Sequence, residues 1–245
     1  MKDNFSAQAE AYANFRPHYP TEMYAFIYGQ LSCYDRALDI ATGNGQVAKE
    51  LAAKFSQVYA TDISAKQLSE APQLPNIQYK QEAAEQSSFA DHFFDLVTVA
   101  QAIHWFNFDA FYANVRRITK PGGIIAVAGY GLVSVNTVTD RWLQHFYTNI
   151  IGPYWDSERK YIDDHYTTIP FPFEEISAPS LFIRYKWSKQ QFLGYLNTWS
   201  AVQHFIRANS VNPLAGDTLQ RLDSIWPDNT CYDISFPLLL RVGRL

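Results

Sequence analysis

The residues best suited to chemistry in this chain form a short turn, Asp39 to Gly45 (DIATGNG), in which an acid precedes two glycines. Glycines at such a bend let the backbone approach a ligand closely and adopt positive φ. After the turn, Val47, Leu51 and Phe55 recur every four residues, which predicts an amphipathic helix from Gln46 to Phe55. Free N–H groups at the start of a helix favour an anionic part of a ligand. The turn therefore predicts a nucleotide-cofactor site.

Two kinds of cofactor are compatible with this turn. From Gly43 onward the sequence GNGQVA fits the loose dinucleotide pattern G-x-G-x-x-G/A. A dinucleotide-binding strand usually stays apolar up to its first glycine, whereas Asp39 stands four residues before Gly43. An acid there suits an ammonium group, such as the one at the methionine end of S-adenosylmethionine. Asp62 ends the next apolar segment, where a carboxylate can bind the ribose of either cofactor. Asp39 thus favours S-adenosylmethionine over NAD.

Alternating strands and helices must position these acids. Apolar segments predict strands at residues 36–41, 58–62, 77–80, 94–100 and 124–128, with two more at 181–187 and 231–242. A helix is expected over about 109–118, followed by a sharp turn at Lys120 to Gly123. This order is typical of an α/β fold. We expect a seven-stranded, mostly parallel sheet with an antiparallel last strand and helices on both faces.

Composition narrows the function classes. The 245 residues carry a formal net charge of −4, which gives no electrostatic reason to expect nucleic acid. The N-terminus lacks the apolar core of a signal peptide, and the longest apolar-rich run, Ile124 to Val133, is about half a membrane span. Cys33 and Cys231 lie far apart and form no CxxC pair. We expect a cytoplasmic protein with no membrane partner and no metal; the sequence leaves the oligomeric state open.

Aromatic residues are concentrated late in the chain, with 16 of them between positions 142 and 205. Aromatic rings supply a large apolar contact area with few torsions to freeze. They indicate a helical, aromatic-rich cap, which either covers the sheet or also lines a substrate cavity with its inner rings. The candidate cavity rings are Trp105, Tyr130, Tyr154, Trp155 and Trp199.

Several segments, in order along the chain, carry a resemblance to a known family. They are Phe5-Ser6…Ala9…Tyr12…Arg16-Pro17-His18-Tyr19-Pro20, the turn Asp39 to Gly45 with Ala41 in place of the first glycine of D-x-G-x-G-x-G, Ala84-Glu85, Gln101 to Phe106, and Arg117 to Gly123. The chain resembles the class I S-adenosylmethionine-dependent methyltransferases. Within that superfamily it resembles the small-molecule group that includes trans-aconitate methyltransferases.

The resemblance implies a Rossmann-like fold and one domain over residues 1–245. Its expected parts are an N-terminal lid segment (1–30), a cofactor-binding core (31–133), a cap insertion (134–180), and the remaining cap helices and C-terminal strands (181–245). The implied reaction is methyl transfer to a small molecule, with a carboxylate oxygen as the leading acceptor. The implied cofactor-binding residues are Arg16, Tyr19, Asp39, Ala41, Gly43, Gly45, Asp62, Ile63, Ala84, Glu85 and Gln101.

Among these roles, Asp39 and the glycine turn would hold the amino-acid end of the cofactor, and Asp62 the ribose. Ile63 would pack on the adenine, with Ala84 and Glu85 at its edge and Glu82 as an alternative to Glu85. Gln101 would lie near the methionine portion. Arg16 would pair with the cofactor carboxylate or with an acidic substrate.

His104 is the candidate catalytic residue. A carboxylate acceptor is ionised at neutral pH and needs no general base, whereas a phenol, an amine or a carbon acid benefits from one. His104 follows the 94–100 strand at the carboxyl edge of the sheet, where such folds bind ligands. The alternative is a histidine that packs under the cap. A polycarboxylate substrate would need cations, and the sequence does not show whether Arg141, Arg159 or Arg184 points inward. An NAD-dependent oxidoreductase and a non-catalytic S-adenosylmethionine-binding module stay as alternatives.

Overall fold

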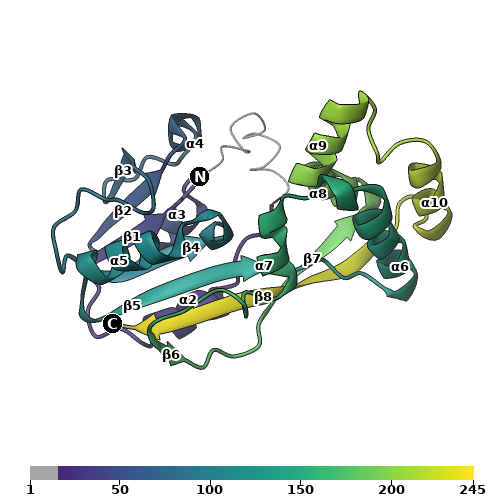
Figure 1. The fold of residues 1–245 in the computed structure, drawn as a ribbon. Coiled ribbons are helices and arrows are strands. Elements are labelled where there is room, and N and C mark those ends of the chain that lie inside the picture. Colours follow the sequence, from purple (N-terminus) through teal and green to yellow (C-terminus); the bar gives the residue numbers. More distant parts are fainter. Residues whose placement is uncertain (1–15) are drawn as a thin grey trace.

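A computed structural model describes residues 16–245, and an eight-stranded sheet forms its centre (Figure 1). Five neighbouring strands are parallel: β1 (Arg36–Ile40), β2 (Gln57–Asp62), β3 (Ile77–Gln81), β4 (Phe94–Ala100) and β5 (Thr119–Tyr130). Three are antiparallel to their neighbours: β6 (Glu174–Ile176), β7 (Phe182–Ser188) and β8 (Cys231–Arg244). The predicted fold class is confirmed, and β6 is one short strand more than the seven expected.

The strand order, β3-β2-β1-β4-β5-β8-β6 with β7 beside β8, places the functional turn. The chain moves outward from β1 to β3 and then returns to add β4 on the other side of β1. In open sheets of this type, ligands bind at the carboxyl ends of the strands where the order reverses. Asp39 of β1 lies in register with Thr98 of β4 at this reversal.

Helices cover both faces of the parallel strands. The side chains of Leu38 and Val97 pack in a cluster with α5 (Phe108–Ile118), whereas the adjacent Ala37 and Leu96 pack on the opposite face. That opposite face is covered by α2 (Thr21–Tyr28) and α3 (Gln46–Ala52), and α4 (Ala65–Ser69) follows β2. Strands buried on both faces are apolar throughout, which is why the sequence pattern located them.

The expected sharp turn at residues 120–123 lies inside β5. Gly122 has a φ of 75°, and the pairing of β4 with β5 shifts register between Phe94 and Leu96. Gly122 N donates to Leu245 O at 2.8 Å, so the end of the chain holds the irregular residues in the ladder. The chain thus departs from the ladder at the predicted turn, where β5 advances five residues against two of β4, but this irregularity lies inside the strand rather than ahead of it.

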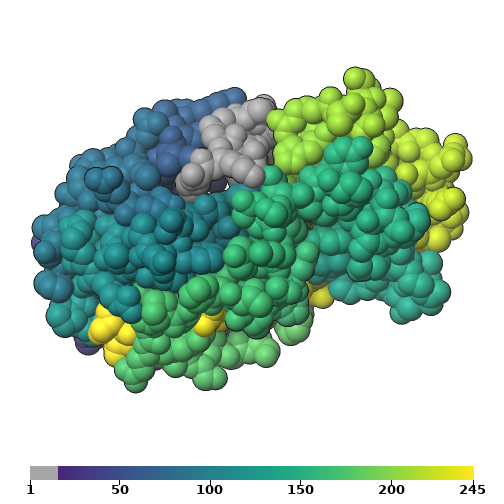
Figure 2. All heavy atoms as spheres, in the orientation of Figure 1, coloured from purple at the N-terminus to yellow at the C-terminus, as the bar shows by residue number. Residues whose placement is uncertain are grey.

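Beyond the carboxyl end of β5 the chain builds a cap. Its helices are α6 (Thr137–His145), α7 (Lys160–Asp163), α8 (Lys189–Asn197), α9 (Ser200–Asn209) and α10 (Asp217–Ile225), with a π-helical turn at Phe146–Ile150. Figure 1 shows α6, α8, α9 and α10 gathered at one end of the molecule, and in Figure 2 the green cap surface adjoins the blue and teal sheet-bearing half. Phe146, Phe192 and Trp226 are fully buried inside the cap, so many of its aromatic rings form core.

The strand β8 runs through both the parallel part of the sheet and the cap. Its residues 238–244 pair with β5, and its residues 231–237 pair with β7 in the cap. Gly131 N donates to Pro237 O at 3.0 Å where the chain leaves β5. One continuous strand thus fixes the cap against the sheet. Within residues 16–245, the helices are too short or too polar for any to span a membrane.

Candidate active site

The larger candidate pocket lies at the carboxyl ends of β1, β2 and β4. It encloses about 910 Å³ of empty space, part of it open to solvent. The turn after β1, the residues after β2 and the residues after β4 all contribute to its walls. The predicted cofactor residues that line it are Arg16, Tyr19, Asp39, Ala41, Gly43, Asp62, Ile63 and Gln101.

Asp39 is a buried acid that braces the turn. Its Oδ1 accepts a hydrogen bond from Thr98 Oγ1 at 2.7 Å, and its Oδ2 accepts one from Thr42 Oγ1 at 2.5 Å. Burial raises the pKa of Asp39 to about 6, with a further increase from the charge of Asp62, although the threonine hydroxyls act in the opposite direction. At pH 7 the carboxylate is still ionised, and it places a negative charge at the pocket wall.

Asp62 ties the glycine turn to the end of β2. Its Oδ2 accepts from Gly43 N at 2.9 Å and its Oδ1 from Ser64 N at 2.8 Å. An ionised carboxylate has about four acceptor positions, so it can serve backbone and ligand donors together. The side chain also lines the pocket.

Two non-glycine residues at this edge adopt left-handed backbone conformations: Ala41 with a φ of 54° and Gln101 with a φ of 52°. Such residues cost roughly 1–2 kcal/mol and concentrate at functional sites. Gln101 Oε1 accepts from Tyr130 N at 3.2 Å. A Cβ on Gly129 would lie 2.7 Å from that same oxygen, so glycine there makes room for the Gln101 side chain.

Alanine at the two turn glycines is expected to affect different properties, namely stability at Gly45 and cofactor binding at Gly43. A Cβ on Gly45 would lie 2.7 Å from Tyr79 Oη, and the φ of Gly45 is 78°. On Gly43 the nearest atom would be 3.8 Å away, at Gln67 Oε1. Gly45→Ala should therefore lower the free energy of unfolding by roughly 2–4 kcal/mol, from strain plus overpacking. Gly43→Ala should cost about 1 kcal/mol of stability and instead weaken cofactor binding.

Urea unfolding and titration with S-adenosylhomocysteine measure both effects. Equal stability losses in the two variants would contradict the assignment of Gly45 to packing and Gly43 to the pocket wall.

A second pocket opens directly off the first. The two share Arg16, Gln101, Trp105 and Tyr130, and the second encloses about 580 Å³, again partly open. Its remaining walls come from His104 and from the cap. Four of the five candidate cavity rings line it, namely Trp105, Tyr130, Trp155 and Trp199. Tyr154 lines neither pocket; its hydroxyl accepts from Asn209 Nδ2 at 2.9 Å.

His104 lines the second pocket and is only 6% exposed. Burial, together with the positive charges of Arg159 and Arg16, lowers the pKa of His104 to about 3. The ring is therefore neutral at physiological pH and a weak base. Its Nδ1 is buried and has no hydrogen-bond partner within residues 16–245. An unsatisfied buried nitrogen of this kind costs about 1–3 kcal/mol unless a ligand contacts it.

Of the three arginines that could serve an acidic substrate, one lines a pocket. Arg159 is part of the second pocket, whereas Arg141 and Arg184 are exposed and lie outside both pockets. Arg16 lies where the two pockets meet, and its Nη1 donates to Tyr130 Oη at 3.0 Å. The cavity next to the cofactor pocket thus carries two guanidinium groups.

Some predicted site residues lie elsewhere. Glu85 Oε1 accepts from Asn107 N at 3.1 Å, just before α5, and Ala84 O accepts from Asn114 Nδ2 at 3.0 Å. Neither residue lines either pocket. Gly45 is in the turn behind the pocket wall rather than in its lining. The motif residues Phe5, Ser6, Ala9 and Tyr12 lie outside the described part of the chain.

Other pocket residues were not predicted from the sequence. The first pocket also contains Thr42, Ser64 and Gln67, and the second contains Asp156 and Tyr195. Thr42 was within reach of sequence reasoning, because it occupies a variable position of the glycine motif. Asp156 and Tyr195 carry no local pattern that separates them from other cap residues.

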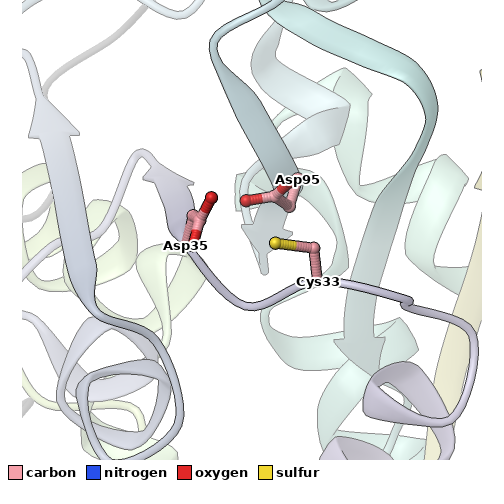
Figure 3. Close-up of side chains that lie close together, drawn as sticks. All are labelled: Cys33, Asp35 and Asp95. Carbon is pink, nitrogen blue, oxygen red and sulfur yellow. The ribbon is translucent and has the colours of Figure 1, made fainter.

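One cluster elsewhere has metal-ligand residue types: Cys33, Asp35 and Asp95, at the amino ends of the strands (Figure 3). Asp95 Oδ1 accepts from Lys120 Nζ at 2.6 Å, and its Oδ2 accepts from Arg36 N at 2.9 Å. Lys120 therefore already supplies the cation that balances the buried carboxylate. Asp95, through its ion pair with Lys120 and its hydrogen bond from Arg36 N, links the starts of β1, β4 and β5.

Known proteins resemble this chain over most of its length. A methyltransferase-domain family model matches residues 38–127. A Dictyostelium discoideum protein named as a methyltransferase is 33% identical over 249 residues, covering 99% of this chain and 95% of that protein. A solved structure described as a type II methyltransferase, from Anaeromyxobacter dehalogenans, is 34% identical with a TM-score of 0.86, covering 94% of this chain and 98% of the other. A methyltransferase structure from Bacillus halodurans, at 18% identity and a TM-score of 0.53, is similar in fold alone.

These similarities decide between the cofactors that the glycine turn allowed. The family match contains the turn, Asp62 and the strand before Gln101, which supply most of the walls of the larger pocket. None of the names of these relatives gives an acceptor, so the trans-aconitate-like subgroup stays a prediction. The chain belongs to the class I S-adenosylmethionine-dependent methyltransferases, and S-adenosylmethionine is its cofactor.

Proposed function

We propose that this enzyme transfers a methyl group from S-adenosylmethionine to a carboxylate oxygen of a small acid. The observation that carries this proposal is the composition of the second pocket. It combines the guanidinium groups of Arg16 and Arg159 with a histidine whose pKa is lowered to about 3. Cations favour an anionic acceptor, and a weak base suits an acceptor that arrives already deprotonated.

In this proposal the larger pocket holds the cofactor, and its lining residues support one orientation. Asp62 would bind the ribose hydroxyls, Ile63 would pack on the adenine, and Asp39 would face the ammonium group. Arg16 and Tyr19 would close over the amino-acid end, and Gln101 would lie near the methionine portion. When bound, S-adenosylmethionine supplies a methyl group already activated on a sulfonium sulfur. The adenine-edge role proposed for Ala84 and Glu85 has no support from the pocket lining.

Alignment is then the main task of the protein. Arg16, Gln101 and Tyr130 lie where the two pockets meet, so an acceptor oxygen beside them faces the cofactor side. Orientation of two reactants supplies about 7–11 kcal/mol in favourable cases. No proton has to move when a carboxylate is methylated. In this proposal His104 contacts the acceptor as a neutral hydrogen-bonding group.

The test is methyl transfer from labelled S-adenosylmethionine to a panel of small carboxylic acids, amines, phenols and thiols. We expect S-adenosylhomocysteine together with a product that releases methanol in alkali, as a methyl ester does. Transfer only to an amine, a phenol or a thiol would overturn the carboxylate assignment. Tight cofactor binding without S-adenosylhomocysteine formation on any acceptor would favour the non-catalytic module.

The pH dependence of turnover provides a separate prediction. Because neither a carboxylate acceptor nor His104 titrates between pH 7 and pH 9, kcat at saturating cofactor should stay within about twofold over that range. A base-dependent acceptor, such as a phenol, would instead give a rate that rises with pH. Initial rates in constant-ionic-strength buffers distinguish the two results.

A further inference from the structure

The second pocket extends well beyond the point where it meets the first, and Arg159 lies in that distal part. Arg159 lines the second pocket but not the first, whereas Arg16 lines both. A group held by Arg16 can therefore lie beside the cofactor, and a group held by Arg159 is separated from it by the shared residues. The two guanidinium groups are not interchangeable in position.

The guanidinium of Arg159 is held in place along one edge only. Its Nε donates to Tyr147 Oη at 2.8 Å and lies 3.3 Å from Asp163 Oδ1. The Tyr147 hydroxyl in turn donates to the same Asp163 oxygen at 2.7 Å. Within residues 16–245 the side-chain hydrogen bonds of Arg159 all use Nε. The edge formed by Nη1 and Nη2, which binds carboxylates in a two-point geometry, is left for a ligand.

Packing also fixes the plane of this group. The guanidinium carbon lies 4.6 Å from the ring centroid of Trp155 and 5.3 Å from that of Tyr147. Tyr147 belongs to the π-helical turn Phe146–Ile150, a departure from regular helix that often occurs at functional sites. A guanidinium ordered before the ligand arrives loses little freedom on binding.

The surroundings contain more donors than acceptors. Nε1 of Trp105 and Nε1 of Trp155 are buried without a hydrogen-bond partner in the described residues, and both residues line this pocket. Among residues 16–245, its charged lining groups are Arg16, Arg159 and one acid, Asp156, whereas His104 is neutral at pH 7. A net positive cavity with unsatisfied N–H groups selects an anion.

We propose that Arg159 is a specificity-determining residue that binds a second, non-reacting carboxylate of the acceptor, so that the preferred substrate is a small dicarboxylate. This rests on the proposed function, since it assumes that the reacting group lies at the shared boundary. Tyr147 and Asp163 are positioning residues that act through Arg159. The carboxylate of Asp163 partly balances the positive charge of the guanidinium when no ligand is bound, and it contacts the guanidinium only at Nε.

The experiment compares diacids with their monoamides, which keep length and shape but lose one charge. Succinate, fumarate and glutarate would be assayed against succinamate, fumaramate and glutaramate, with the full-length wild type, Arg159→Gln and the control Arg141→Gln. We expect at least one diacid to exceed its monoamide in kcat/KM by roughly 10- to 100-fold in the wild type. In Arg159→Gln that ratio should fall to about one, mainly through KM, and Arg141→Gln should keep it.

Binding is measured as well as turnover. Calorimetric titration of the same diacid into the S-adenosylhomocysteine complex should show the loss in Arg159→Gln while S-adenosylhomocysteine affinity and Tm stay unchanged. Tyr147→Phe should raise KM for the diacid by about threefold to tenfold, with kcat and the monoamide KM unaffected. If KM for the diacid and KM for the monoamide rise by the same factor, the role of Tyr147 is structural and does not act through Arg159.

The outcomes separate this inference from the proposed function. If monocarboxylates and monoamides are esterified as well as diacids by the wild type, the role of Arg159 is wrong and carboxylate methylation stands. The role is equally wrong if Arg159→Gln lowers diacid and monoamide turnover to the same extent. If no carboxylic acid is methylated but another acceptor is, the proposed function itself fails.

Discussion

Asp62→Ala should lower the affinity for S-adenosylhomocysteine by about 2–4 kcal/mol, because in the proposed binding mode it removes the carboxylate that accepts from two ribose hydroxyls. The carboxylate lines the larger pocket and is held by Gly43 N and Ser64 N, so its position is fixed before the cofactor binds. Removing it also leaves those two N–H groups without this partner, and we expect a stability loss of about 1–3 kcal/mol.

Asp62→Ala should lose the same affinity for every ligand that contains the ribose. Calorimetric titration with 5′-methylthioadenosine, which lacks the amino-acid end, should show the same loss as S-adenosylhomocysteine. Asp91→Ala serves as the control, since Asp91 is an exposed acid that pairs with Arg117 away from the pocket. An unchanged 5′-methylthioadenosine affinity in Asp62→Ala would place the ribose elsewhere.

Asp39→Asn should make the ligand-free protein more stable at pH 8 and should lower its affinity for the cofactor. Burial raises the pKa of Asp39 from 3.8 to about 6, so the native state binds a proton more tightly than the unfolded chain does. The contribution of Asp39 to the free energy of unfolding of the wild type is therefore fully present below about pH 4 and is lost as the pH rises through 6. The loss at pH 8 is about 3 kcal/mol at most, and the asparagine variant does not incur it.

Urea unfolding at pH 5 and pH 8 checks the stability effect, since the gain in Asp39→Asn should be clearly larger at pH 8. Binding checks the functional effect. We expect at least a tenfold loss for S-adenosylhomocysteine, whose ammonium group faces Asp39 in the proposed binding mode, and little change for 5′-methylthioadenosine. A pH-independent stability difference would contradict the raised pKa, and equal losses for both ligands would contradict the ammonium assignment.

The sheet could be predicted because its strands are local patterns. β1, β2, β4 and β5 are apolar runs of the kind that only doubly covered strands show. β6 could not be found in this way: it has three residues, two of them glutamate, and it forms because the edge of β8 is available to pair. The start of β5 ahead of the predicted turn was missed for a related reason, since Gly122 is held by a contact with Leu245.

The site residues also divide into those set by local sequence patterns and those set by contacts between distant residues. The turn and its two acids were predictable because strand ends and glycines stand together in the sequence. The side chain of Glu85 was assigned to the pocket from resemblance, and its observed partner, Asn107, is 22 residues away. The orientation of Arg159 depends on Tyr147, Trp155 and Asp163, which no sequence periodicity links.

The placement of the cap has a consequence for how acceptor choice can change. The chain leaves β5 after Tyr130 and pairs with β5 again at Leu238 of β8, and these two residues are paired neighbours in the β5–β8 ladder. The segment between them includes β6 and β7, which both pair with β8. Residues 131–237 supply Trp155, Arg159 and the other distal walls of the second pocket, whereas the cofactor pocket is built before them. The segment is thus a cassette with adjacent ends, and exchange of this cassette between related enzymes would transplant acceptor selectivity onto an unaltered cofactor-binding half.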